Sequence, residues 1–139
     1  MFGNISNLRR ALNDIEGGLA RFVVMGDLNT MGRDPFEDED ETTSKQEIAD
    51  LTQFMAQGGM TLQDKSAEKT FLKYKDHKTV EFETDLDHVI SSDVTPLKTI
   101  ANGAKVLVRG WNDLTTDEER IEWTRNISDH ASIEIEIDL

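Results

Sequence analysis

The first hydrophobic positions of the chain follow a helical spacing and then form a continuous run. Four apolar residues lie three or four positions apart at the start: Ile5, Leu8, Leu12 and Ile15. This spacing predicts an opening helix of about three turns, which Gly17-Gly18 ends. The run from Leu19 to Met25 then predicts a buried strand. A helix, a glycine turn and a buried strand in this order are typical of α/β layering.

Two capping boxes indicate further helices, because a Ser or Thr side chain and a Glu three residues later satisfy the free amides of a first helical turn. Ser44 with Glu47 predicts a helix that ends at the glycine pair 58–59. Its apolar positions have helical spacing: Ile48, Leu51 and Met55. Thr116 with Glu119 predicts a helix that runs through about Arg125.

Three later segments have the patterns of strands: "LDHVIS" at 86–91, "AKVLVR" at 104–109 and "ASIEIEIDL" at 131–139. In the last segment three isoleucines alternate with polar residues: Ile133, Ile135 and Ile137. A period of two marks a strand with one buried and one wet face. Residues 60–79 are mixed in character, and their pattern predicts no single element.

Charge and composition limit the classes of function. The 139 residues suggest one domain or a part of one. Lys and Arg number 15 and Asp and Glu 28, which gives a net charge of −13. Such a chain repels polyanions unless bound divalent cations reverse the local field, so long duplex DNA is not the first substrate to expect.

The absence of cysteine excludes disulfides, thiolate zinc sites and cysteine nucleophiles together. No apolar run approaches the length of a membrane span, and the N-terminus has no basic region followed by an apolar stretch. We therefore expect a soluble, cytoplasmic protein with no membrane partner.

Residues 33–43, "RDPFEDEDETT", form the most acidic stretch. A cation-binding tract is one interpretation, but calcium loops require alternating ligands and a glycine at the turn, which this run lacks. We therefore expect a solvated loop. His77, in a lysine-rich segment with no partner nearby in sequence, is expected at the surface.

Polar side chains gather at three strand ends. Asp27 and Asn29 follow the first strand, the pair at 87–88 begins the "VIS" strand, and Asp129 with His130 precedes the last one. Residues just outside strand ends can converge on one edge of a sheet. Together they would supply carboxylates for a hard cation such as Mg²⁺, a carboxamide and an imidazole, a set that suits phosphoryl chemistry. Each element also has a plainer interpretation, since "GDLN" can be a turn and an Asp-His dipeptide a surface pair.

In their order, the motifs "GDLN" at 26–29, "LDHV" at 86–89 and "SDH" at 128–130 resemble the endonuclease/exonuclease/phosphatase superfamily. These are Mg²⁺-dependent phosphoesterases similar to deoxyribonuclease I and the exonuclease III class. The stretch "VRGWNDLTTDEERIEWTRNISDH" is similar to a bacterial branch of largely unassigned activity. The resemblance implies that residues 1–139 are a single domain, the C-terminal half of a four-layer α/β/β/α sandwich. Such a half is mainly one mixed sheet with helices on one face.

The resemblance also implies a role for each motif residue. Asp27 would orient or deprotonate the attacking water near the metal, and Asn29 would hold the scissile phosphate. Asp129 would join Asp27 in the shell of Mg²⁺ or Mn²⁺. His130 would bind the phosphate and stabilise its developing charge. Asp87 would pair with His130, fixing its tautomer and raising its pKa.

Two neighbouring positions are expected to be structural. His88 follows the motif aspartate on an alternating strand, so it should point away from Asp87. Thr70-Phe71 resembles the Thr-aromatic stretch that precedes the Asp-His strand in this family. A wall of the substrate site is possible there, and core packing is favoured.

The first half of such a sandwich carries a further Asn and the principal metal-binding Glu, and no segment before "GDLN" matches it. We therefore expect a weak metal site, an open apolar sheet face, and either a homodimer or a complementing N-terminal half. Two functions stay open. The first is a metal-dependent phosphoesterase, incomplete as this chain, that acts on a small phosphodiester, a phosphomonoester or a nucleic acid end. The second is a catalytically silent half-domain that serves binding or assembly.

Overall fold

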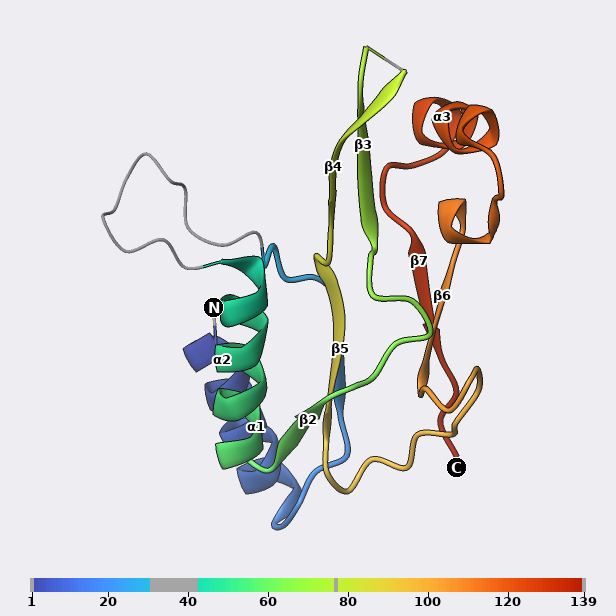
Figure 1. The fold of residues 1–139 in the computed structure, drawn as a ribbon. Helices are drawn as coiled ribbons and strands as arrows, with labels where there is room; N and C mark the ends of the chain where they lie inside the picture. The colour runs from blue at the N-terminus through green and yellow to red at the C-terminus, as the bar shows by residue number, and fades with distance from the viewer. Residues whose placement is uncertain (1, 31–42, 77, 139) are drawn as a thin grey trace, which may run out of the picture.

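The computed structural model describes residues 2–30, 43–76 and 78–138. Within them the chain forms an α+β domain of three α-helices, one short 3₁₀ helix and seven strands (Figure 1). The strands make three small antiparallel sheets. In the described part of the chain, no helix is long and apolar enough to cross a membrane.

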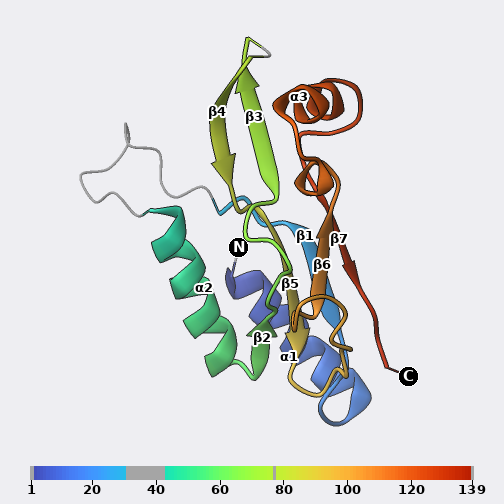
Figure 2. The ribbon, with the colours of Figure 1, turned by 45° about the vertical axis from the view of Figure 1, so that its right-hand side comes forward.

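The first sheet has the order β1-β5-β2, with β1 at Val23–Asp27, β5 at Asp87–Ser92 and β2 at Met60–Leu62. Every residue of the central strand β5 is buried. In both ribbon views β5 lies between α2 on one side and β7 on the other (Figures 1 and 2). The open apolar face that we expected is therefore absent along β5.

Helices α1 (Phe2–Glu16) and α2 (Ser44–Gln57) form where their apolar spacing predicted them and lie against this sheet. In α1 only Ile5 of the four spaced apolar residues is buried, whereas Leu8 and Ile15 are 47% and 79% exposed. The core between them consists of buried side chains from both helices and two strands: Ile5, Leu51, Met55, Met60 and Ile90. Each fully buried side chain of this kind stabilises the fold by roughly 1.5–3 kcal/mol.

The cap of α2 differs from the prediction by one residue. Thr43 is the N-cap, and its hydroxyl accepts a hydrogen bond from the Gln46 amide at 3.2 Å. Ser44 is the first helical residue, and its hydroxyl donates to the carbonyl oxygen of Thr30 at 2.6 Å. A tertiary acceptor therefore takes the Ser44 side chain away from the capping role.

Strands β3 (Phe71–Lys75) and β4 (Thr79–Thr84) form the second sheet, in the region where the sequence predicted no element. In Figure 1, β4 continues almost directly into β5. The chain from 60 to 75 thus runs antiparallel to the chain from 79 to 92, but it leaves the ladder between β2 and β3. There Lys65 makes a single parallel bridge to Val106 instead.

The third sheet pairs β6 (Val106–Arg109) with β7 (Ser132–Ile135). A 3₁₀ helix, η1 (Trp111–Asp113), and α3 (Asp117–Asn126) connect the two strands. The capping box of Thr116 and Glu119 is present, as predicted. A second core lies among these elements and β3: Leu72, Tyr74, Val108, Trp111 and Ala131.

The expectation of one mixed sheet is not met by the described strands. Their ladders are antiparallel and fall into three sheets, which isolated bridges such as Phe71–His130 connect. The physical reason is the departure of residues 64–69 from the long hairpin, which interrupts the ladder between the backbone hydrogen bonds of Gln63 to Val89 and of Thr70 to Thr84. Residues 33–42 of the acidic stretch and His77 lie outside the described residues, so the predictions made for them stay predictions.

Candidate functional site

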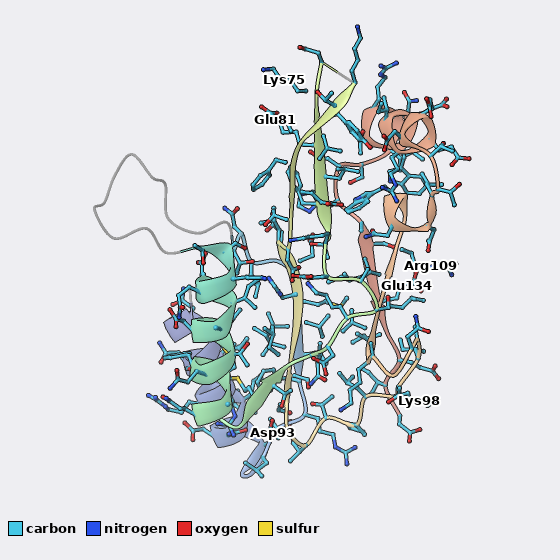
Figure 3. All side chains as sticks on the ribbon, in the orientation of Figure 1. Lys75, Glu81, Asp93, Lys98, Arg109 and Glu134 are labelled. Carbon is cyan, nitrogen blue, oxygen red and sulfur yellow. The ribbon has the colours of Figure 1, made fainter. Side chains whose placement is uncertain are left out.

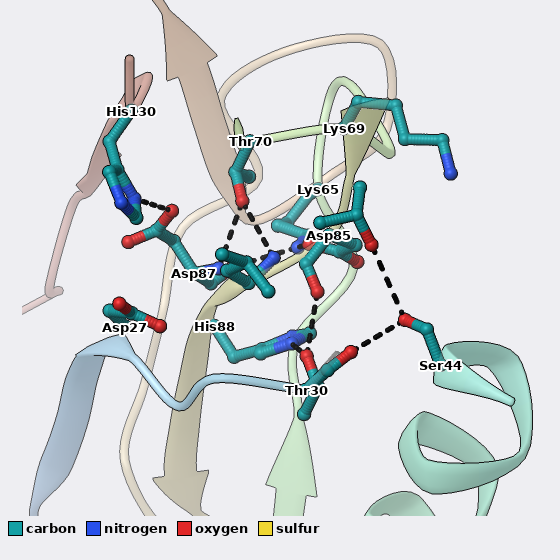
Figure 4. Close-up of polar contacts among 12 residues, drawn as sticks. Asp27, Thr30, Ser44, Lys65, Lys69, Thr70, Asp85, Asp87, His88 and His130 are labelled. Atoms are coloured by element: carbon teal, nitrogen blue, oxygen red, sulfur yellow. Dashed lines mark hydrogen bonds and ion pairs between the residues drawn. The ribbon is translucent and has the colours of Figure 1, made fainter. Parts of the chain in front are cut away.

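The Asp87 carboxylate and the His130 imidazole form a direct hydrogen bond. Nδ1 of His130 lies 2.9 Å from Oδ2 of Asp87 (Figure 4). Asp87 is the first residue of β5, and His130 reaches it because its backbone bridges to Phe71 at the start of β3. The His130 side chain is 31% exposed and that of Asp87 10%, so the imidazole meets solvent while its partner is buried.

The surroundings of His130 favour its charged form. Burial alone would lower its pKa, but the hydrogen bond and charge of Asp87, with the charges of Asp129 and Asp27, outweigh burial and raise the pKa. The Phe71 ring meets the imidazole edge-on, with ring centroids 5.0 Å apart. The site therefore presents an imidazole that a carboxylate holds and whose pKa is raised, and such an imidazole can bind an anion when it is protonated.

Asp27 lies beside this pair. It is the last residue of β1, and the antiparallel register places it opposite Asp87 (Figure 4). Its Oδ1 accepts a hydrogen bond from the Asn29 amide at 2.7 Å, and Asn29 has a φ of 55°. "GDLN" is therefore a turn, and the same turn holds an exposed carboxylate at the edge of the candidate site. Asn29 contributes its backbone amide to this turn, and the residue itself is exposed.

Asp129 is exposed next to His130, and its backbone carbonyl accepts from the Leu72 amide at 2.9 Å. Of the predicted residues, the fold thus gathers Asp27, Asp87 and His130, with Asp129 adjoining. In the part of the chain that the structure describes, no group of three or more His, Cys, Asp or Glu side chains is arranged to hold a metal ion. These carboxylates do not make a complete metal site by themselves.

A second polar cluster lies behind the pair, and no pattern in the sequence predicted it. The Lys65 ammonium forms a buried ion pair with Asp85 and donates to the carbonyl oxygen of Asp87 at 2.7 Å. Burial lowers the pKa of Lys65 and raises the pKa of Asp85, and each charge opposes the effect on the other. Nothing in the local pattern distinguishes Lys65 from a surface lysine such as Lys69.

His88 points to the opposite face of β5, as the strand alternation predicted. His88 is 2% exposed, and its Nε2 lies 2.7 Å from the Thr30 hydroxyl oxygen. That hydroxyl donates its hydrogen to the Asp85 carbonyl at 2.6 Å, so the His88 Nε2–H is the donor of the other bond. Burial, and then the charge of Lys65, lower the pKa of His88 to about 4. His88 is therefore a neutral structural residue near pH 7.

Comparisons with protein-family models, with curated proteins and with solved structures gave no match to this chain. The resemblance to the phosphoesterases therefore depends on the three short motifs and on the geometry of the site that they form.

Proposed function

We propose that this chain is a divalent-metal-dependent phosphoesterase half-domain whose active residues are Asp27, Asn29, Asp87, Asp129 and His130. The observation that supports this most directly is the 2.9 Å Asp87–His130 hydrogen bond at a partly exposed edge. The proposed substrate is a phosphodiester or phosphomonoester, either a small molecule or a nucleic acid end. The net charge of −13 favours small substrates over long polyanions.

His130 would perform the electrostatic part of the reaction. Its Nδ1–H is held by Asp87, so its Nε2–H is left to bind a phosphate oxygen. A charge-assisted hydrogen bond of this kind strengthens as negative charge develops on the phosphate in the transition state. Asp27 would orient the attacking water, and Asn29 would contact the phosphate.

Asp27 and Asp129 are the proposed ligands of Mg²⁺ or Mn²⁺. Because the described residues contain no group of three ligands, the other ligands would come from the substrate phosphate, from water and from a second polypeptide. That polypeptide is either a second copy or a complementing N-terminal half, which would complete a four-layer sandwich. Light scattering at rising concentration, with and without metal and substrate, tests whether a dimer forms.

The decisive experiment is hydrolysis of a chromogenic phosphodiester with Mg²⁺ or Mn²⁺, and with EDTA as the metal-free control. We expect His130→Ala and Asp87→Asn to reduce the rate by about 100-fold or more, since a positioned imidazole contributes roughly 10²–10⁴-fold. Asp93→Asn is the matched control. Asp93 follows the other end of β5, where its carboxylate accepts from the Thr61 hydroxyl at 2.8 Å (Figure 3). Equal activity of folded His130→Ala and wild type would refute the site.

One observation favours the second function, a silent binding module: the described residues lack a three-ligand metal group. A catalyst loses its activity when Asp27 or His130 is changed, whereas a binding module need not. Folded wild-type protein that hydrolyses nothing, and that binds a phosphate ester equally well as His130→Ala in calorimetry, would support the binding module.

A further inference from the structure

Thr70 is fully buried and contacts the start of β5 through its side chain. Its Oγ1 accepts hydrogen bonds from the amides of Leu86, at 3.0 Å, and Asp87, at 2.9 Å. Both bonds meet at the Thr70 hydroxyl in Figure 4. A hydroxyl oxygen has two lone pairs, so this one side chain satisfies both amides.

The backbone of Thr70 contacts the segment that carries His130. Its carbonyl oxygen accepts from the amide of Ala131, the residue after His130, at 2.7 Å. Its own amide donates to Thr84 at the end of β4, at 3.0 Å. Thr70 therefore touches both strands that bring Asp87 and His130 together.

The interrupted hairpin explains why a side chain is needed here. Between β4 and β5 the amides of residues 86 and 87 face the stretch where the opposite arm has left the ladder. Asp87 pairs with Asp27 of β1 on one side, and on the side of the interrupted hairpin its buried amide needs another acceptor. The Thr70 hydroxyl replaces the absent ladder partner at the residue whose carboxylate holds the imidazole.

Two neighbouring contacts also hold Asp87 and His130 in place. The Lys65 ammonium binds the carbonyl oxygen of Asp87, so both peptide groups that flank the Asp87 side chain are held. On the other partner, the Phe71 ring lies against the imidazole of His130. The hydroxyl of Thr70 is thus one part of a rigid support beneath the pair.

We propose that Thr70 is a positioning residue for the Asp87–His130 pair, because its hydroxyl fixes the Asp87 backbone while its carbonyl fixes the His130 segment. Any effect of Thr70 on catalysis rests on the proposed function. The positioning of Asp87 and His130 by Thr70 does not depend on that function, because it concerns the protein without substrate.

The test compares Thr70→Val with Thr95→Val. Valine keeps the shape of threonine and removes the acceptor. Thr95 is a matched control, because it is also buried and its hydroxyl accepts from the Phe22 amide at 3.1 Å, near the opposite end of the first sheet. One readout is the hydrogen-bonded Nδ1–H signal of His130 in ¹⁵N-edited NMR at fixed pH. The other is the Nδ1–Oδ2 distance, 2.9 Å here, in a crystal structure.

We expect the signal to be lost and the distance to lengthen in Thr70→Val, with both kept in Thr95→Val. A folded Thr70→Val protein with the original signal and distance would overturn the inference. Should that variant not fold, Thr70→Ser and Thr70→Cys decide the question, because they differ in one atom and sulfur is a weak acceptor. Serine should keep the signal and cysteine should weaken it, and identical spectra would refute the role.

Neither the NMR measurement nor the crystal structure requires a substrate. A wild-type protein that hydrolyses no phosphate ester would count against the proposed function and leave this comparison valid. If hydrolysis is found, Thr70→Val should lower kcat about tenfold, in line with a misplaced catalytic group, while KM changes little.

Discussion

Each of the three histidines follows an aspartate in the sequence, and the environments of two of them, His88 and His130, shift their pKa values in opposite directions. His88 is enclosed beside Thr30, and burial together with Lys65 lowers its pKa to about 4. For His130, burial is outweighed by the surrounding carboxylates, above all Asp87, and the pKa is raised. The Asp-His dipeptide alone therefore does not determine the pKa of the histidine, because the burial of the imidazole and its charged neighbours do.

The lowered pKa of His88 predicts a specific loss of stability in acid. The unfolded chain binds a proton at this residue as pH falls below about 6.5, while the folded protein stays neutral there until about pH 4. The stabilisation that depends on neutral His88 is therefore fully present above about pH 6.5 and is lost as the pH falls from about 6.5 to about 4. Its size is on the order of 3 kcal/mol, since each pKa unit corresponds to about 1.4 kcal/mol.

Urea unfolding between about pH 4 and pH 6.5 measures this loss of stability. His88→Asn is the comparison, because an amide can still donate to the Thr30 hydroxyl. Wild type should lose stability more steeply than the variant as pH falls. Parallel curves would show that His88 does not cause the acid sensitivity.

Because the Lys65–Asp85 ion pair is buried, we expect the loss of its lysine to destabilise the protein more than the loss of a lysine from an exposed pair. Lys65→Met would leave a buried carboxylate without its partner, and we expect a loss of about 3–5 kcal/mol in the free energy of unfolding. Lys98→Met is the control, because the Lys98–Glu136 pair is exposed (44% and 52% exposed side chains) and should contribute less than about 1 kcal/mol. Chemical denaturation measures both, and equal effects would contradict the burial argument.

At the scale of elements, the interruption between β2 and β3 matters most. A continuous hairpin would pair residues 64–69 with the end of β4 and the start of β5, whereas this stretch crosses to β6 and leaves the amides of Leu86 and Asp87 to the Thr70 hydroxyl. The break in a regular ladder thus coincides with the residue that holds His130. Irregular pairing is where a strand can aim a side chain that a regular sheet would constrain.

The capping box of α3 gives a prediction at this scale. Thr116→Ala removes the hydroxyl that accepts from the Glu119 amide at 3.3 Å, so stability should fall by about 1 kcal/mol. Thr115→Ala is the adjacent control, because alanine keeps the backbone amide that donates to Glu119, and the Thr115 hydroxyl is the smallest of the influences on the pKa of Glu119. Its effect should stay within about 0.5 kcal/mol. Thermal unfolding distinguishes them, and a neutral Thr116→Ala would mean that packing alone sets the start of α3.

At the scale of the whole molecule, the net charge of −13 and the metal ligands that we propose, Asp27 and Asp129, predict how ions act. Salt should stabilise the protein by screening repulsion between like charges. Without a phosphate ester, MgCl₂ and NaCl at equal ionic strength should raise Tm equally. A resident Mg²⁺ site would add about 2.7 kcal/mol at a hundred times its Kd.

An extra rise in Tm with MgCl₂ that Asp27→Asn or Asp129→Asn removes, and Asp93→Asn does not, would show that this chain binds the metal without substrate. An extra rise that none of the three removes would place the metal elsewhere. Equal effects of the two salts agree with ligands that arrive with the phosphate or with a second polypeptide.

The sequence by itself determined the helices, the strand patterns of β5, β6 and β7 and the Thr116 cap, because apolar spacing and capping are local properties. It also indicated that Asp87 would meet His130, through the motifs rather than through any local rule. Only the tertiary structure decided that the strands form three sheets, that Thr43 rather than Ser44 caps α2, and that Lys65 and Thr70 support Asp87. Those outcomes depend on which distant segments pair, and a buried amide or ammonium takes the acceptor that the fold brings near it.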